Sequence, residues 1–109
     1  ACTIHGDGEH IRDYVYVGDV ARANLAAIEL GRGESFAVNI GTGIGTTTNE
    51  LYAGLARAAG SDALPNHGPA RAGDLLANRV DPSLAGRLLA WSPLTSLGDG
   101  LTSTYDSFA

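Results

Sequence analysis

The sequence predicts a small α/β fold that combines short strands with about four helices. Hydrophobic residues recur at helical spacing in the stretches that begin near Asp19, Thr47, Asp81 and Ser96, and each of these residues is a common helix start. Brief apolar runs bounded by glycine lie between the helices and are typical of short strands. With 109 residues, the chain has room for one domain at most.

Composition and charge limit the partners of this chain. The formal net charge is -5, and the isoelectric point is about 4.9. An acidic chain does not suit a general nucleic-acid or anionic-membrane surface, so neither partner is expected. All seven cationic residues are arginine. The lack of lysine excludes Schiff-base chemistry, a P-loop lysine and a Tyr-x-x-x-Lys pair on this chain.

Metal sites and disulfides are not expected either. Cys2 is the single cysteine, so it can form no internal disulfide and no cysteine cluster for zinc. The histidines (His5, His10 and His67) lack the spacing of metal ligands. The acidic residues Asp7, Glu9 and Asp13 lack calcium-loop spacing and are interpreted as a solvated turn. No signal peptide or membrane-spanning run is found, which favours a cytoplasmic protein.

Three extended segments are predicted in the first forty or so residues. Residues 2–5 alternate in polarity and end at a glycine turn, so they are interpreted as a short strand. Tyr14 to Val17 form an apolar extended segment. Phe36 to Ile40 are interpreted as a short buried strand.

The first helix is predicted to begin at Asp19, whose carboxylate would accept backbone N–H groups as a cap. One face of this helix is apolar and comprises Val17, Ala21, Leu25 and Ile28. Gly31 and Gly33 are expected to end it.

The second helix has the clearest start signal. Thr47 and Glu50 have the spacing of a capping box, and Gly60 is expected to close the helix. Residues 61–73 are rich in glycine, proline, aspartate and asparagine, which predicts a long loop with one short strand.

Two further helices follow. Pro82 favours a helix start beside Asp81, and Trp91 after this helix is expected in the core. The last helix should run from about Ser96 to Phe108. It is predicted to bury Leu97, Leu101 and Phe108.

Arginines at two places are candidates for binding an anion. Arg12 lies between a glycine turn and an apolar segment, where its guanidinium could hold phosphate oxygens bidentately. The alternative is a surface arginine paired with Asp13 or Asp19. Arg71 and Asp74 lie in the long loop and are equally open to two interpretations, ligand contact or an exposed ion pair.

A glycine-rich loop, Gly41-Thr-Gly-Ile-Gly-Thr, follows the predicted strand at Phe36 to Ile40 and suggests a dinucleotide-binding fingerprint as an alternative. That fingerprint needs glycine at its first, third and sixth positions. The sixth position here is Thr46, so the spacing does not fit. A structural turn is the favoured interpretation.

Four collinear stretches resemble the extended short-chain dehydrogenase/reductases that act on nucleotide sugars, such as UDP-hexose 4-epimerases and dTDP-glucose 4,6-dehydratases. The first runs from Gly6 to Val20 and reads Gly-Asp-Gly-Glu-His-Ile-Arg-Asp-Tyr-Val-Tyr-Val-Gly-Asp-Val, with His10 where the family usually has glutamine. The others are Phe36 to Gly43, Thr47 to Leu51 and Pro69 to Asp74. Together they cover nearly the whole chain.

This resemblance implies the C-terminal portion of a Rossmann-type NAD-dependent epimerase/dehydratase, which is not a complete independent fold. The NAD-binding N-terminal domain would lie outside residues 1–109. In such a portion Arg12 and Arg71 would contact the diphosphate of a UDP- or dTDP-sugar, and Asp74 would contact the ribose or steady Arg71. Thr3 and His5 would border the base.

The same resemblance implies that the parent enzyme passes hydride to and from a bound NAD, with a tyrosine and a lysine as its catalytic pair. Those motifs lie upstream in the family, so no catalytic residue and no NAD site are assigned to this chain alone. We expect the isolated chain to expose apolar surface and to self-associate. The alternative function is a standalone, non-catalytic module that binds a nucleotide or a protein.

Overall fold

The computed structural model describes residues 2–31 and 35–109, so Gly33, expected above to help end the first helix, lies outside the described residues. Eight elements follow one another: β1 (Thr3–His5), β2 (Ile11–Arg12), α1 (Val17–Leu30), β3 (Thr46–Thr47), α2 (Thr48–Ala59), β4 (Asn66–Gly68), α3 (Ser83–Leu89) and α4 (Leu97–Phe108). The predicted α/β class with short strands and four helices is confirmed.

The strands form two small ladders. β1 pairs with β4 in parallel, with Ile4 opposite His67. β2 pairs with β3 in antiparallel, and Ile11 also bridges Ala77 on the opposite edge of β2. Both the strand expected at residues 2–5 and the strand expected within the loop at 61–73 are therefore present.

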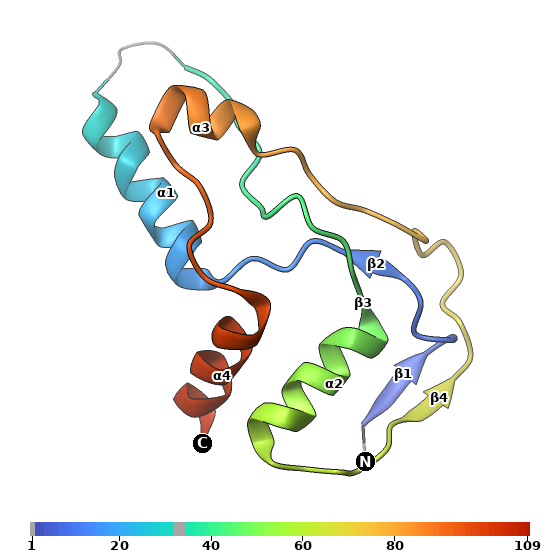
Figure 1. The fold of residues 1–109 in the computed structure, drawn as a ribbon. Helices are drawn as coiled ribbons and strands as arrows, with labels where there is room; N and C mark the ends of the chain where they lie inside the picture. Colours follow the sequence, from blue (N-terminus) through green and yellow to red (C-terminus); the bar gives the residue numbers. More distant parts are fainter. Residues whose placement is uncertain (1, 32–34) are drawn as a thin grey trace.

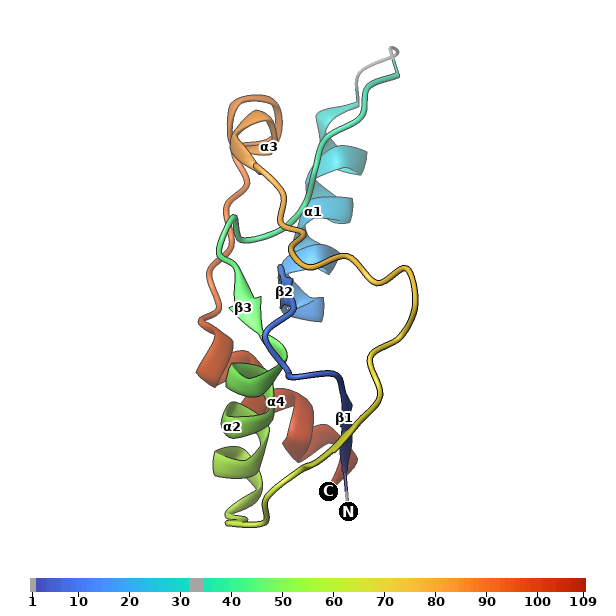
Figure 2. The ribbon, with the colours of Figure 1, turned by 90° about the vertical axis from the view of Figure 1, so that its right-hand side faces the viewer.

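The helices gather in two pairs at opposite ends of a flat molecule. α1 packs against α3 at one end and α2 against α4 at the other, with β2 and β3 between them (Figure 1). Figure 2 shows how thin the molecule is from the side, and its principal extents are 49 × 33 × 17 Å. The radius of gyration is 16.3 Å, whereas a compact chain of this length would have about 13 Å. This open shape agrees with the expectation of an incomplete fold.

The core is small and lies where α1 meets α3. Ala23, Ala85 and Trp91 are buried there, and Val38 and Ile40 pack against them. Trp91 is 2% exposed, and its indole Nε1 donates a hydrogen bond of 2.9 Å to the backbone oxygen of Asp19. Trp91 is thus a core residue, as its sequence context predicted.

Asp19 does not cap α1. The helix begins at Val17, and its N-cap Tyr16 provides no side-chain cap. Asp19 lies within the first turn and is 3% exposed. Its carboxylate accepts hydrogen bonds from the Arg22 guanidinium and from the backbone amides of Leu94 and Thr95. The predicted cap is therefore wrong, because this carboxylate joins α1 to the segment that precedes α4.

Large apolar side chains remain exposed on several elements. On α1, Val17 is 71% exposed and Ile28 is 75% exposed. Phe108, predicted to be buried, is 87% exposed. The segments expected to be extended, Phe36–Ile40 and Tyr14–Tyr16, form no strand, because no strand in the described ranges pairs with them. Val17 already belongs to α1. No helix in these ranges has the length and apolar character to cross a membrane.

The capping box at the start of α2 is formed as predicted. The Thr47 hydroxyl accepts from the Glu50 amide at 3.0 Å, and the Glu50 carboxylate accepts from the Thr47 amide at 3.0 Å. Gly60 closes the helix in the left-handed conformation with φ 67°.

Replacing Thr47 with alanine should lower the free energy of unfolding by about 1 kcal/mol, because the Glu50 amide loses the Thr47 hydroxyl as its acceptor. Chemical denaturation followed by circular dichroism measures this change. Thr47→Ser keeps the hydroxyl and is the matched control. A Thr47→Ala variant as stable as Thr47→Ser would show that the box contributes nothing.

Candidate functional site

All five residues expected to contact a ligand line one cavity of about 290 Å³. They come from three separate segments: Thr3 and His5 from β1, Arg12 from β2, and Arg71 and Asp74 from the loop after β4. Alternation along β1 places Thr3 and His5 on the same face, while Ile4 between them is buried.

Backbone hydrogen bonds hold the loop of Arg71 and Asp74 against the strands. Before the loop, the Gly6 amide donates to the Gly68 oxygen at 2.9 Å. After it, the Ile11 amide donates to the Leu76 oxygen and the Ile11 oxygen accepts from the Asn78 amide, both at 2.9 Å. Because Arg12 follows Ile11 directly, these bonds also set where Arg12 lies relative to the loop.

The two arginines have donors to spare. Arg12 donates from Nη1 to the Ile11 oxygen at 2.7 Å, and its Nη2 lies 3.9 Å from a carboxylate oxygen of Asp74. Its ion-pair partner is therefore Asp74, and neither of the two alternatives named above, Asp13 and Asp19. Within the described residues Arg71 has no ion-pair partner. A guanidinium has five N–H donors, so both arginines keep donors for an anion.

Asp13, interpreted above as part of a solvated turn, instead binds the glycine-rich loop. Its carboxylate accepts from the Thr42 amide at 2.9 Å, the Thr42 hydroxyl at 2.6 Å and the Gly43 amide at 2.9 Å. The Val80 amide lies 3.4 Å away. Burial alone would raise the pKa of Asp13, but these donors outweigh it and hold the pKa below its ordinary value. The solvated-turn interpretation is therefore wrong for Asp13.

The same contacts count against a pyrophosphate site in the glycine-rich loop. The amides of Thr42 and Gly43 donate to Asp13, and the Ile44 amide donates to the Thr42 hydroxyl. Gly41 allows this close approach, since a Cβ there would lie 2.8 Å from an Asp13 carboxylate oxygen. The loop is a structural corner whose anion is a side chain of the protein itself, and it does not fit a dinucleotide.

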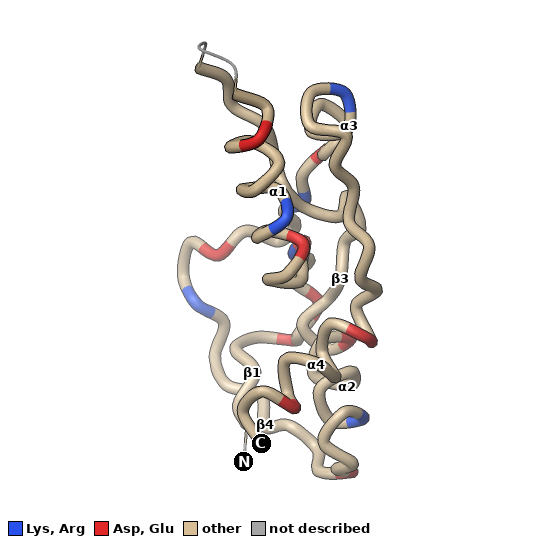
Figure 3. The backbone as a smooth tube through the Cα atoms, turned by 90° about the vertical axis from the view of Figure 1, so that its left-hand side faces the viewer, with Lys and Arg blue, Asp and Glu red and all other residues tan. Residues whose placement is uncertain are grey.

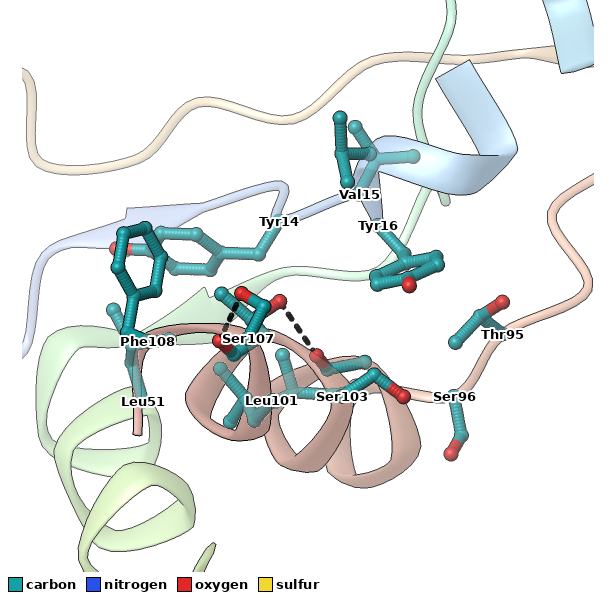
Figure 4. A pocket seen from close by; sticks show the side chains of 14 residues that line it. Tyr14, Val15, Tyr16, Leu51, Thr95, Ser96, Leu101, Ser103, Ser107 and Phe108 are labelled. Atoms are coloured by element: carbon teal, nitrogen blue, oxygen red, sulfur yellow. Dashed lines mark hydrogen bonds between the residues drawn. The ribbon is translucent and has the colours of Figure 1, made fainter. Parts of the chain in front are cut away.

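A larger, apolar groove of about 560 Å³ lies between α4 and the segment that joins β2 to α1. In Figure 4, Tyr14 and Tyr16 extend toward α4 from one side, and Leu101 faces them from the other. The hydroxyls of Thr104 and Ser107 donate to backbone oxygens of their own helix. No charged side chain of the described chain lines this groove, so it is not a site for a phosphate.

Positive charge is local in this structure. In Figure 3 the basic positions are separated from one another along the tube, with acidic positions between them. Two of these arginines, Arg12 and Arg71, line the 290 Å³ cavity.

Sequence reasoning missed three polar residues of the cavity, namely His10, Tyr14 and Thr48. His10 stands two residues before Arg12, so its closeness to that arginine was available as a signal. Thr48 had no such signal, because it reaches the cavity through the pairing of β2 with β3.

Comparison with known proteins finds similar sequences among UDP-glucose 4-epimerases. Residues 1–41 match the model of the NAD dependent epimerase/dehydratase family. The UDP-glucose 4-epimerase of Mycolicibacterium smegmatis is 41% identical over 106 residues, which are 96% of this chain and 33% of that protein. The chain is similar to one portion of proteins in the NAD-dependent epimerase/dehydratase family. It spans about a third of the length of the relatives it matches.

Solved structures of this epimerase/dehydratase family share the fold. UDP-glucose 4-epimerase from Thermotoga maritima, determined with UDP-glucose, superposes with a TM-score of 0.91 at 45% identity, over 98% of this chain and 34% of that one. The enzyme from Bifidobacterium longum, in complex with NAD+ and UDP, gives a TM-score of 0.86 at 31% identity, over 94% and 32% of the two chains. The predicted likeness to part of an extended short-chain dehydrogenase/reductase is confirmed.

Proposed function

We propose that this chain forms the substrate-binding portion of a nucleotide-sugar epimerase or dehydratase, in which Arg12 and Arg71 hold the diphosphate of a UDP- or dTDP-sugar. The observation that carries the proposal is that two arginines from separate segments line one cavity. Asp74 lies 3.9 Å from Arg12. It would therefore steady Arg12, where the resemblance had suggested the ribose or Arg71.

The chemistry of a nucleotide-sugar fits such a cavity. Its diphosphate carries two negative charges, and guanidinium groups bind phosphate oxygens through short, charge-assisted hydrogen bonds. At about 290 Å³ the cavity is at the lower limit of ligand sites, which usually measure about 300 to 1,000 Å³. It would take the diphosphate and its neighbouring groups, with Thr3 and His5 toward the base.

The rest of the enzyme would come from the portion that precedes this one. NAD, when bound there, supplies the hydride acceptor for the sugar carbon. This chain adds no lysine beside its tyrosines, and the Thr42 and Gly43 amides of its glycine-rich loop already donate to Asp13. We infer that an N-terminal NAD-binding domain covers the exposed apolar residues of α1, such as Val17 and Ile28. Without that domain the same residues would drive self-association.

Replacing Arg12 or Arg71 with alanine should weaken UDP-glucose binding about 10- to 150-fold, which corresponds to about 1.5 to 3 kcal/mol for hydrogen bonds to a charged group. Isothermal titration calorimetry measures the affinity, and NMR titration covers the millimolar range. UDP should bind where uridine does not, because uridine lacks the diphosphate.

Arg57→Ala is the matched control, because Arg57 is exposed on α2 and lies outside the cavity. It should leave UDP-glucose binding unchanged. Equal binding of uridine and UDP, or full binding by the Arg12→Ala, Arg71→Ala double variant, would contradict the proposal. NADH binding that depends on Gly41 and Gly43 would instead favour the dinucleotide interpretation.

A further inference from the structure

The charges that line the cavity fall short of those of the ligand proposed for it. Arg12 and Arg71 bring two positive charges, and Asp74, close to Arg12, removes one. One net positive charge then faces a diphosphate with two negative charges. A second positive charge inside the cavity would complete the balance.

His10 is placed to supply that charge. It is half-buried and lines the same cavity as Arg12 and Arg71. Gly6 marks its surroundings: a Cβ on Gly6 would lie 3.4 Å from the His10 ring carbon Cε1 and 3.4 Å from the Ala70 Cβ. The His10 ring and Ala70, which immediately precedes Arg71, therefore both lie beside Gly6.

The other titratable groups near His10 do not replace it. His5 also lines the cavity but is exposed to solvent on β1, so its charge is better screened. His67 lies outside the cavity, where its Nδ1 is 2.8 Å from the Gly6 oxygen.

The acidic and phenolic residues near His10 also leave its imidazole available to contact a ligand in the cavity. Glu9 precedes it in the chain, but its carboxylate accepts from the Asn49 amide group at 2.7 Å, away from the cavity lining. Asp7 accepts from the Glu9 amide. Tyr14 lines the cavity with its phenol ring, and Thr48 brings a hydroxyl from the start of α2.

We propose that His10 is a further diphosphate-binding residue, and that the cavity takes up a proton at its imidazole when a nucleotide diphosphate sugar binds. This inference rests on the proposed function. An imidazole gains its charge between about pH 5 and 8, and a neighbouring anion favours the charged form. Affinity therefore rises as the pH falls through this range, and binding near neutral pH removes protons from the solution.

UDP-glucose is the probe, because each of its two phosphates carries one ester bond and the shared anhydride bridge, and so keeps one negative charge throughout this range. Its dissociation constant for the full chain is measured by calorimetry from pH 6 to pH 8, in buffers of different ionisation enthalpy that report proton uptake. We expect about 5- to 10-fold tighter binding at the lower pH, with uptake of a fraction of one proton near pH 7. In the wild-type chain, the NMR signals of the His10 ring should move toward the charged form when UDP-glucose is added.

His10→Gln should abolish the pH dependence and the proton uptake. His67→Gln is the matched control, because His67 lies outside the cavity, and it should keep both effects. Binding that does not depend on pH, or a dependence that survives in His10→Gln or disappears in His67→Gln, would overturn this inference while the proposed function stands. No binding at any pH would overturn both.

Discussion

Replacing Trp91 with alanine should lower the free energy of unfolding by about 3 to 5 kcal/mol, the largest effect expected of any single change in this chain. Trp91 joins α1 to α3 in the only cluster of buried apolar residues that the described ranges contain. Its indole N–H pairs with the Asp19 oxygen, and the Arg22 guanidinium lies 6.0 Å from its ring centre. The cavity left by alanine would remove these contacts together. Urea denaturation followed by far-ultraviolet circular dichroism measures the change.

Two variants calibrate the Trp91 result. Trp91→Phe keeps most of the ring but leaves the Asp19 oxygen without its donor, so it should cost about 1 to 3 kcal/mol. Phe108→Ala removes an aromatic residue that is 87% exposed, so it should change stability by no more than about 0.5 kcal/mol. If Phe108→Ala were as damaging as Trp91→Ala, the core would lie elsewhere.

Replacing Asp13 with asparagine should cost about 2 to 3 kcal/mol at neutral pH. One carboxylate oxygen accepts from Thr42 and the other from Gly43 and Val80. In asparagine an NH₂ group replaces one of the two carboxylate oxygens. This NH₂ group would lie opposite N–H donors in either orientation of the side chain. The turn that Asp13 holds fixes the strand of Arg12, so UDP-glucose binding should weaken as well.

The effect of Asp13→Asn should depend on pH in a definite direction. The folded-state pKa of Asp13 is lowered from 3.8, so its carboxylate stabilises the fold at pH values well above 3.8 and loses this effect as the pH falls through the folded-state pKa. The difference between the wild type and Asp13→Asn should therefore shrink in acid. The pKa of Asp19 is also lowered, because its hydrogen bonds outweigh the effect of burial. The stabilisation by the Asp19 carboxylate should therefore also be lost in acid.

Denaturation is measured at pH 7 and at pH 3, which lie above and below the ordinary pKa of 3.8 for an aspartate carboxyl group. Asp7→Asn is the control, because the exposed Asp7 side chain accepts only from the nearby Glu9 amide. A stability difference for Asp13→Asn that stays constant from pH 7 to pH 3 would show that the ionised carboxylate is not the stabilising form.

Local signals in the sequence predicted the elements that depend on local contacts. The Thr47–Glu50 box, the closing glycine Gly60 and the start of the helix beside Pro82 were all found where expected. Each depends on residues within one or two helical turns of one another, so no knowledge of the rest of the fold is needed. The five candidate ligand residues were also brought to one cavity, but the resemblance to a family had selected them.

Long-range features escaped the sequence. The apolar pattern of Phe36–Ile40 predicted a buried strand, yet a strand needs a partner for its backbone groups and none pairs with it in the described ranges. The apolar side chain of Phe108 predicted burial in the same way. An apolar pattern predicts which face of a helix is buried, but it does not identify the element that covers that face. Asp13 and Asp19 were misjudged because their donors lie about 30 and 75 residues away in the chain.

The way residues 69–75 are attached has a consequence for the size of the cavity. Hydrogen bonds around Gly68 fix the start of this segment to β1, and hydrogen bonds to Ile11 fix the chain just after it. Between these two attachments, Gly73 has a φ of 80° and open space around it, since an added Cβ would meet nothing within 4 Å. Extra residues inserted at Gly73 would widen the cavity, while Arg71 would keep its distance from Gly68. The size of this cavity can therefore change with the length of this segment alone.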